Sequence, residues 1–78
     1  MSLLHAAADE GDLEALRDEI EQGENVDRRS GGGNTPLMYA CGEGHLECTQ
    51  ALVDAGAAVD MVDNNGRTAL MKACYFGH

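Results

Sequence analysis

Residues 35–45 read TPLMYACGEGH, and residues 68–78 read TALMKACYFGH. Seven of these eleven positions are identical, and the two stretches start 33 residues apart. The same spacing aligns residues 2–34 with residues 35–67, where ten of 33 positions are identical. The shared residues are mostly turn glycines and small or apolar residues that suit a core, as expected of a repeat protein. The sequence therefore predicts one domain over residues 1–78, made of repeat 1 (2–34), repeat 2 (35–67) and a partial repeat 3 (68–78).

Each of the two full repeats carries the local signals of two short helices. In repeat 2, Thr35 can cap a helix whose first position suits Pro36, and the glycines after Cys41 end it after about two turns. A second helix is predicted over residues 45–55, with Gly56 suited to a left-handed C-terminal position. Apolar spacing then predicts which residues of this second helix are buried. We expect its buried stripe to consist of Leu46, Thr49, Leu52 and Val53.

The second helix is followed by a segment with the signals of a hairpin. Residues 59–68 are predicted to be extended around a tight turn at 63–66, whose Asp-Asn-Asn-Gly sequence suits a reversal. Repeat 1 follows the same plan, but Glu19 stands where repeat 2 has Leu52. A charged residue at that position is typical of a terminal repeat whose outer side faces water. The predicted unit is helix–turn–helix–hairpin.

Residues 35–45 resemble the signature of ankyrin repeats, which is Thr-Pro-Leu-His followed by two small residues and then Gly-His. The match continues through the second helix and the turn of repeat 2, and it covers essentially the whole chain in register. Met38 and Met71 stand where the family has His. The resemblance implies an all-α ankyrin-repeat solenoid that is incomplete at its C-terminal end. It also implies a non-catalytic protein-interaction module without a cofactor.

The resemblance further implies where a partner binds. Ankyrin proteins use the hairpin tips and the short helices, which together line a concave face. Two of the corresponding residues here, Tyr75 and Phe76, have a second interpretation of equal weight, in which they fold over the bare C-terminal end. The predicted partner-binding residues are Arg29, Asn34, Tyr39, Val62, Asn64, Asn65, Arg67, Lys72, Tyr75 and Phe76.

The C-terminal end of the repeat array leaves three explanations open. The chain is a fragment of a longer array, or it associates through this end, or its last helix acts as a minimal cap. The second explanation predicts self-assembly into a homodimer or a larger oligomer, because an uncapped repeat exposes apolar surface. The self-association residues would be Leu70, Ala73, Cys74 and Phe76.

Cysteine and histidine residues are the strongest candidates for chemistry. Cys41 and His45 have a spacing that metal ligands use, and Cys74 and His78 repeat it. We favour packing and turn roles, because stacked repeats keep the two pairs about 10 Å apart. Cys48 is the best candidate nucleophile, but no pocket-forming segment surrounds it. The sequence therefore predicts no metal site, no catalytic residue and no enzyme.

The composition excludes several classes of partner. Fourteen acidic residues against five basic ones give a net charge of −9, which opposes binding to nucleic acid or to an anionic membrane. A basic protein surface is the natural electrostatic complement. The sequence contains no apolar run near the roughly 20 residues that span a bilayer, and we expect no secretory signal. Three cysteines, an odd number, favour a reducing intracellular location in the cytoplasm or the nucleus.

Overall fold

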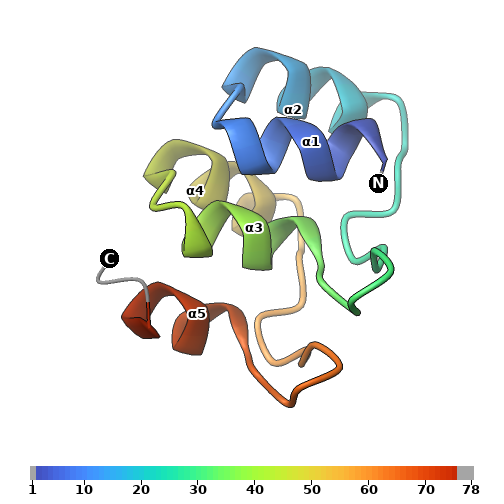
Figure 1. Ribbon diagram of the computed structural model, residues 1–78. Helices are drawn as coiled ribbons and strands as arrows, with labels where there is room; N and C mark the ends of the chain where they lie inside the picture. Colours follow the sequence, from blue (N-terminus) through green and yellow to red (C-terminus); the bar gives the residue numbers. More distant parts are fainter. Residues whose placement is uncertain (1, 76–78) are drawn as a thin grey trace.

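The computed structural model describes residues 2–75, which form helices, turns and extended segments without a β-strand. Figure 1 shows the order of the elements along the chain. The predicted all-α repeat fold is confirmed. The helices in the described residues are α1 (Leu3–Glu10), α2 (Leu13–Glu21), α3 (Pro36–Gly42), α4 (Leu46–Asp54) and α5 (Ala69–Tyr75).

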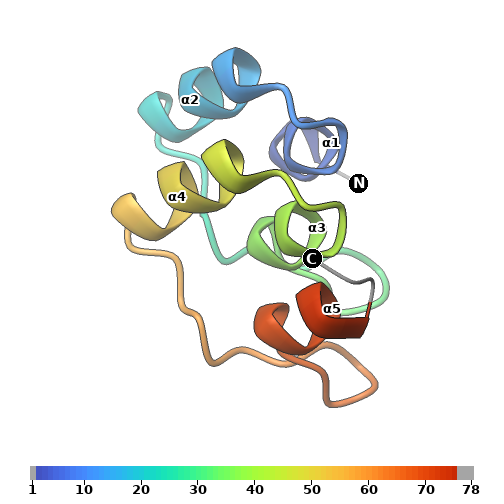
Figure 2. The same cartoon turned by 90° about the vertical axis from the view of Figure 1, so that its left-hand side faces the viewer.

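The helices lie in two layers. The first helices of the repeats, α1, α3 and α5, stack side by side, and α2 and α4 form the second layer (Figures 1 and 2). Within this arrangement α3 packs against α1, α4 and α5, so it occupies the centre of the stack. The extended segments and their turns run from each helix of the second layer to the next helix of the first layer.

The 33-residue repeat is visible in the helix caps. Ser2, Thr35 and Thr68 each accept a hydrogen bond from the backbone N–H three positions later. Such a bond satisfies one of the N–H groups that a helix start leaves without a partner. Gly11 lies at the end of α1 with φ 75°. A Cβ atom there would lie 2.6 Å from Nδ1 of His45, so glycine is also required by the close approach of repeat 2.

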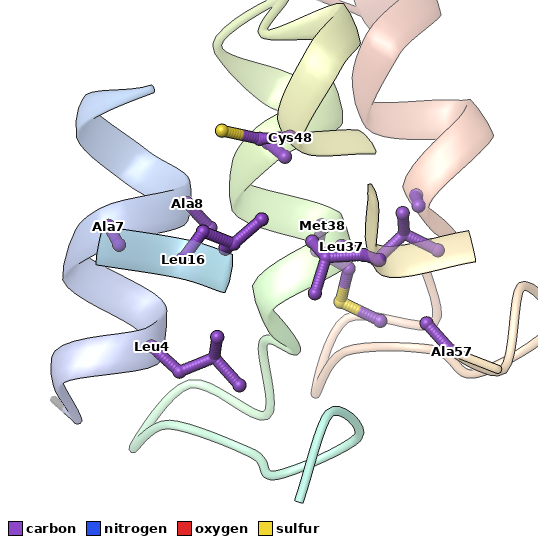
Figure 3. Close-up of a cluster of buried hydrophobic side chains, with 11 residues drawn as sticks. Leu4, Ala7, Ala8, Leu16, Leu37, Met38, Cys48 and Ala57 are labelled. Carbon is purple, nitrogen blue, oxygen red and sulfur yellow. The ribbon is translucent and has the colours of Figure 1, made fainter. Parts of the chain in front are cut away.

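The hydrophobic core lies between the two layers and is mainly aliphatic. Leu4, Leu16 and Leu52 are at most 1% exposed, and Met38, which belongs to the same cluster, is also 1% exposed. Figure 3 shows that the labelled core side chains come from helices of both layers and, at Ala57, from the segment after α4. Burial of each such side chain contributes about 1.5–3 kcal/mol relative to exposure. The core is thus continuous across repeats 1 and 2.

The predicted buried stripe of the second helix in repeat 2 was partly wrong. Leu46 is 81% exposed and Val53 is 41% exposed. The buried line of α4 consists of Cys48 and Leu52, which lie one helical turn apart. This line is narrow because α4 contacts α2 and α3 along one side, and Leu46 lies at its first residue. Thr49 is half-buried, and its hydroxyl donates to the carbonyl of His45 at 2.9 Å.

Candidate functional site

The predicted partner-binding residues between Arg29 and Lys72 lie on one continuous part of the fold, which we call the binding face. It consists of the turn segments 28–34 and 61–67 and of the neighbouring sides of α1, α3 and α5 (Figure 1). Backbone hydrogen bonds close both turns: Ser30 N–H donates to Asn34 at 2.8 Å, and Asp63 N–H donates to Arg67 at 2.9 Å. These residues are 33 positions apart, so the two repeats build the same turn.

The two turns are joined to each other. The Asn64 N–H donates to the carbonyl of Gly32 at 3.1 Å. The Arg29 guanidinium donates to the carbonyl of Gly33 at 3.2 Å and also to the carbonyl of Val62. Gly33 has φ 80°, and a Cβ atom there would lie 2.9 Å from the backbone nitrogen of Asn64. Arg29 and Asn64, both predicted to bind a partner, therefore also hold neighbouring turns together.

The first turn is fixed to the helices by His5 and Tyr39. His5 is 1% exposed. Its Nε2 donates to the carbonyls of Arg28 at 2.7 Å and Asn34 at 3.0 Å. Since both partners are acceptors, Nδ1 is left to accept from the Ser2 hydroxyl at 2.6 Å. The rings of Tyr39 and His5 meet edge to face, with centroids 5.6 Å apart.

Sequence reasoning did not single out His5, although one signal could have identified it. His5 lies 33 positions before Met38, and it therefore occupies the position at which the resembled signature has His. Repeat 1 alone keeps this residue among the three repeats. Its two carbonyl partners show that it closes the turn of its own repeat.

The second turn is fixed to α5 by an ion pair. The Lys72 ammonium lies 2.8 Å from the Asp63 carboxylate, and the side chains are 15% and 3% exposed, respectively. Asp63 also accepts from the backbone N–H groups of Asn65 and Arg67. The hydrogen bond from Lys72, followed by those from the backbone, lowers the pKa of Asp63 to about 2. The predicted partner-binding residue Lys72 is therefore engaged within the fold.

The binding face is hollowed between α1, α3 and α5. A cavity of about 190 Å³ opens there. It brings together three of the predicted residues, Asn34, Tyr39 and Lys72. The predicted partner-binding set does not include two acidic residues of the cavity lining, Asp9 and Glu43. The described residues that line the cavity are Asp9, Asn34, Met38, Tyr39, Gly42, Glu43 and Lys72.

The remaining predicted residues are distributed over the turn of repeat 2 and the end of the chain. Val62 is 40% exposed, and Asn65 and Arg67 are also exposed. Tyr75 is the last residue of α5, and the position of its side chain lies outside the described structure. Phe76 lies outside the described residues.

Three of the residues predicted for self-association, Leu70, Ala73 and Cys74, lie on α5, and Phe76 lies outside the described residues. Leu70 is 73% exposed, Cys74 is exposed and Ala73 is half-buried. The equivalent leucines of the other repeats, Leu4 and Leu37, are 1% and 2% exposed. Within the described residues, no second helix follows α5 to cover Leu70 in the way that α2 and α4 cover the preceding repeats.

The surroundings of Cys41, Cys48 and His45 are those of residues that pack or hold a turn. Burial, together with the charges of Asp12 and Glu47, raises the pKa of the Cys48 thiol, which disfavours the nucleophilic thiolate. Cys41 Sγ lies 3.8 Å from Thr49 Oγ1, and His45 Nε2 donates to the carbonyl of Asp9 at 3.0 Å. His78 lies outside the described residues. In residues 2–75, no three His, Cys, Asp or Glu side chains gather where a metal ion could bind.

The helices of the described residues are also too short and too polar to cross a membrane.

Comparisons with known proteins agree with the repeat pattern. The family model described as ankyrin repeats, in three copies, matches residues 4–78. The crystal structure of the human ASB11 ankyrin repeat domain is similar to the chain, with a TM-score of 0.93 and 42% sequence identity. This likeness covers 99% of the chain but 35% of the ASB11 chain, so the present sequence spans about a third of that domain. The comparison with curated proteins found no match.

Proposed function

The chain belongs to the ankyrin-repeat family, and we propose that it binds a protein or peptide through the binding face without catalysing a reaction. Ankyrin repeats are generally protein-interaction modules and are typically non-catalytic. The observation that carries the proposal is that hydrogen bonds join the two turns to each other. Their backbone groups and Arg29 are engaged with each other, whereas the side chains of Val62 and Asn65 are exposed.

Rigid presentation favours affinity. A loop that is already ordered loses less conformational entropy when a partner docks on it. The turns here are held by hydrogen bonds between repeats and by the Lys72–Asp63 pair. We further propose that the partner presents a basic surface, since the net charge of the chain is −9. We also propose a reducing intracellular location. It is supported by the free thiols of Cys41, Cys48 and Cys74.

The proposal is tested by capture of partners with matched variants. The double variant Val62→Arg/Asn65→Arg alters the exposed turn and repels a basic partner. The control variant Leu46→Arg/Gln50→Arg adds the same charge at exposed positions of α4. Proteins captured from a cell extract by the wild-type chain are identified by mass spectrometry, purified and tested one by one. A direct partner should bind the control variant but not the turn variant. Equal binding to both variants would refute the proposed face.

A second candidate function is self-association through α5. The observation that favours it is the contrast between Leu70, which is 73% exposed, and its equivalents Leu4 and Leu37, which are buried. Met71 is 53% exposed beside it. Pairing of two such surfaces around a two-fold axis would give a closed dimer, and head-to-tail stacking would give filaments.

Solution mass separates this candidate from the first. Light scattering after size exclusion, in reducing buffer and at several concentrations, would report a mass above the 8.3 kDa of one chain. Leu70→Glu should then restore the monomer. Leu46→Glu is the matched control, because Leu46 is 81% exposed on α4. A monomer at every concentration would exclude self-association and leave the binding face as the candidate site.

A further inference from the structure

A glycine of the middle repeat belongs to the lining of the cavity on the binding face. Asp9, Gly42 and Tyr75 are equivalent residues, 33 positions apart, at the C-terminal parts of α1, α3 and α5. Gly42 is buried and contributes no side chain to this row. Asp9, Met38, Gly42 and Glu43 all belong to the lining of this hollow of about 190 Å³.

The charges around the cavity are unbalanced. Asp9 lies in the last turn of α1, and Glu43 is the C-cap residue of α3. A helix C-terminus carries a partial negative charge and favours a nearby cation over a carboxylate. Neither helix has a basic residue in its last turn. Among the described residues that line the cavity, Lys72 carries the one positive charge, and its ammonium is neutralised by Asp63 at 2.8 Å.

An aromatic ring forms part of the same wall. Tyr39 is half-buried and is held by its edge-to-face contact with His5 and by the Ser30 hydroxyl, which lies 3.1 Å from its own. The face of an aromatic ring attracts Arg and Lys side chains. The cavity thus combines a fixed ring, two carboxylates and the negative ends of two helices, and all of these features favour a cation.

We infer that this cavity binds an arginine or lysine side chain presented by a basic protein segment. The inference rests on the proposed function and adds the chemistry of one contact to it. The carboxylates of Asp9 and Glu43 would pair with the cation, and the Tyr39 ring would contact its planar or methylene part. The excess of negative charge over the whole chain would draw the same segment towards this face.

A small probe tests the inference without a known partner. The blocked amino acid N-acetyl-arginine N-methylamide is titrated into the ¹⁵N-labelled chain, and amide chemical shifts are followed. The neutral control is the citrulline analogue, which replaces the guanidinium by a urea of nearly the same shape. We expect saturable shifts at Asp9, Tyr39, Gly42 and Glu43 with arginine and markedly weaker binding of citrulline. Equal binding of the two probes, or shifts confined to other residues, would overturn the inference.

Matched charge variants locate the contact. Asp9→Asn/Glu43→Gln should weaken arginine binding about two- to tenfold, as expected for partly exposed charge pairs. The control Glu14→Gln/Asp18→Asn removes one Glu and one Asp from exposed positions of α2 and should leave the affinity unchanged. Both variants must keep the wild-type circular dichroism spectrum. Equal weakening of arginine binding by the two double variants would mean that net charge alone attracts the probe. Tighter binding of a glutamate probe than of the arginine probe would mean that Lys72 selects an anion. Either result would overturn the inference.

The outcome is separable from that of the proposed function. A partner that loses binding to Val62→Arg/Asn65→Arg but binds Asp9→Asn/Glu43→Gln as well as the wild type would support the binding face. The same result would refute the cation cavity. Loss of the partner with both double variants would support both.

Discussion

Ser30 and Asp63 are equivalent residues that fix the same turn by different chemistry. In repeat 1, the Ser30 hydroxyl lies 3.1 Å from the Tyr39 hydroxyl. In repeat 2, the Asp63 carboxylate pairs with Lys72, which occupies the position of Tyr39. The two pairs connect a turn to the next helix of the first layer, one with a neutral contact and the other with an ionic one. The stability of the second turn should therefore depend on the ionisation of Asp63.

Asp63→Asn tests the ionic contact while keeping an oxygen that can accept the turn hydrogen bonds. The pKa of Asp63 is about 2 in the folded chain, against about 3.9 in an unfolded one. A lowered pKa stabilises the fold above the unfolded value and ceases to do so as pH falls through the folded value. We expect the variant to be less stable than the wild type at pH 7. The difference should shrink as the pH falls from about 4 towards 2.

Urea unfolding followed by circular dichroism at a series of pH values measures this difference. Asp60→Asn is the control, because Asp60 is exposed and lies near the same turn. A difference between Asp63→Asn and the wild type that stays constant over the whole pH range would contradict the assignment.

The elements of the second layer bury a single line of side chains. Leu52 is fully buried in α4, whereas Leu46, in the same helix, is 81% exposed. Leu52→Ala should therefore lower the free energy of unfolding by about 2–5 kcal/mol, through lost burial and the cavity that it leaves. Leu46→Ala should change it by no more than about 0.5 kcal/mol. Urea denaturation of the two variants measures both, and similar losses would mean that α4 packs differently.

The sequence predicts the helices well because their signals are local. Thr35 and Pro36 mark the start of α3, and the 33-residue period transfers that assignment to Ser2 and Thr68. The buried line of α4 was harder to predict, because an apolar spacing does not specify which neighbours a helix contacts. Contacts between distant residues, such as His5 with the Arg28 carbonyl, leave no local pattern. Asp9 and Glu43 are not in the predicted set either, because their place in one cavity depends on how the helices pack.

The contact between neighbouring turns can be isolated with two equivalent glycines. Gly33 and Gly66 have φ 80° and 76°, so alanine should cost about 1–2 kcal/mol of backbone strain at either position. Only the Gly33 site adds a close approach to Asn64, whereas a Cβ atom at Gly66 would meet nothing within 4 Å in the described structure. Gly33→Ala should thus be the more destabilising by about 1–3 kcal/mol. Equal thermal destabilisation of the two variants would show that the close contact between Gly33 and Asn64 does not affect stability.

The whole stack is held by contacts between adjacent repeats. His45 of repeat 2 donates to the Asp9 carbonyl of repeat 1, and the Ala58 N–H donates to the Asp27 carboxylate at 2.8 Å. Helix α3 has neighbours on both sides within its layer and α4 behind it, whereas α5 packs mainly against α3. In such a linear array, the stability of each unit depends on its nearest neighbours. Protection from local opening should therefore be highest in α3 and should fall towards α5.

Native-state hydrogen exchange measures this gradient amide by amide. In the dilute monomer, the α3 amides of Tyr39 and Ala40 should exchange slowest among helical residues, and the α5 amides of Lys72 and Ala73 should exchange fastest. If chains associate through α5, exchange of the α5 amides should slow as the protein concentration rises. Association stabilises the folded form of α5, because only that form associates. Leu70→Glu should abolish that concentration dependence and leave α3 unchanged, since Leu70 is exposed and α3 is the centre of the stack. Equal protection of α3 and α5 in the dilute monomer would contradict the gradient and would mean that the stack opens as one cooperative unit.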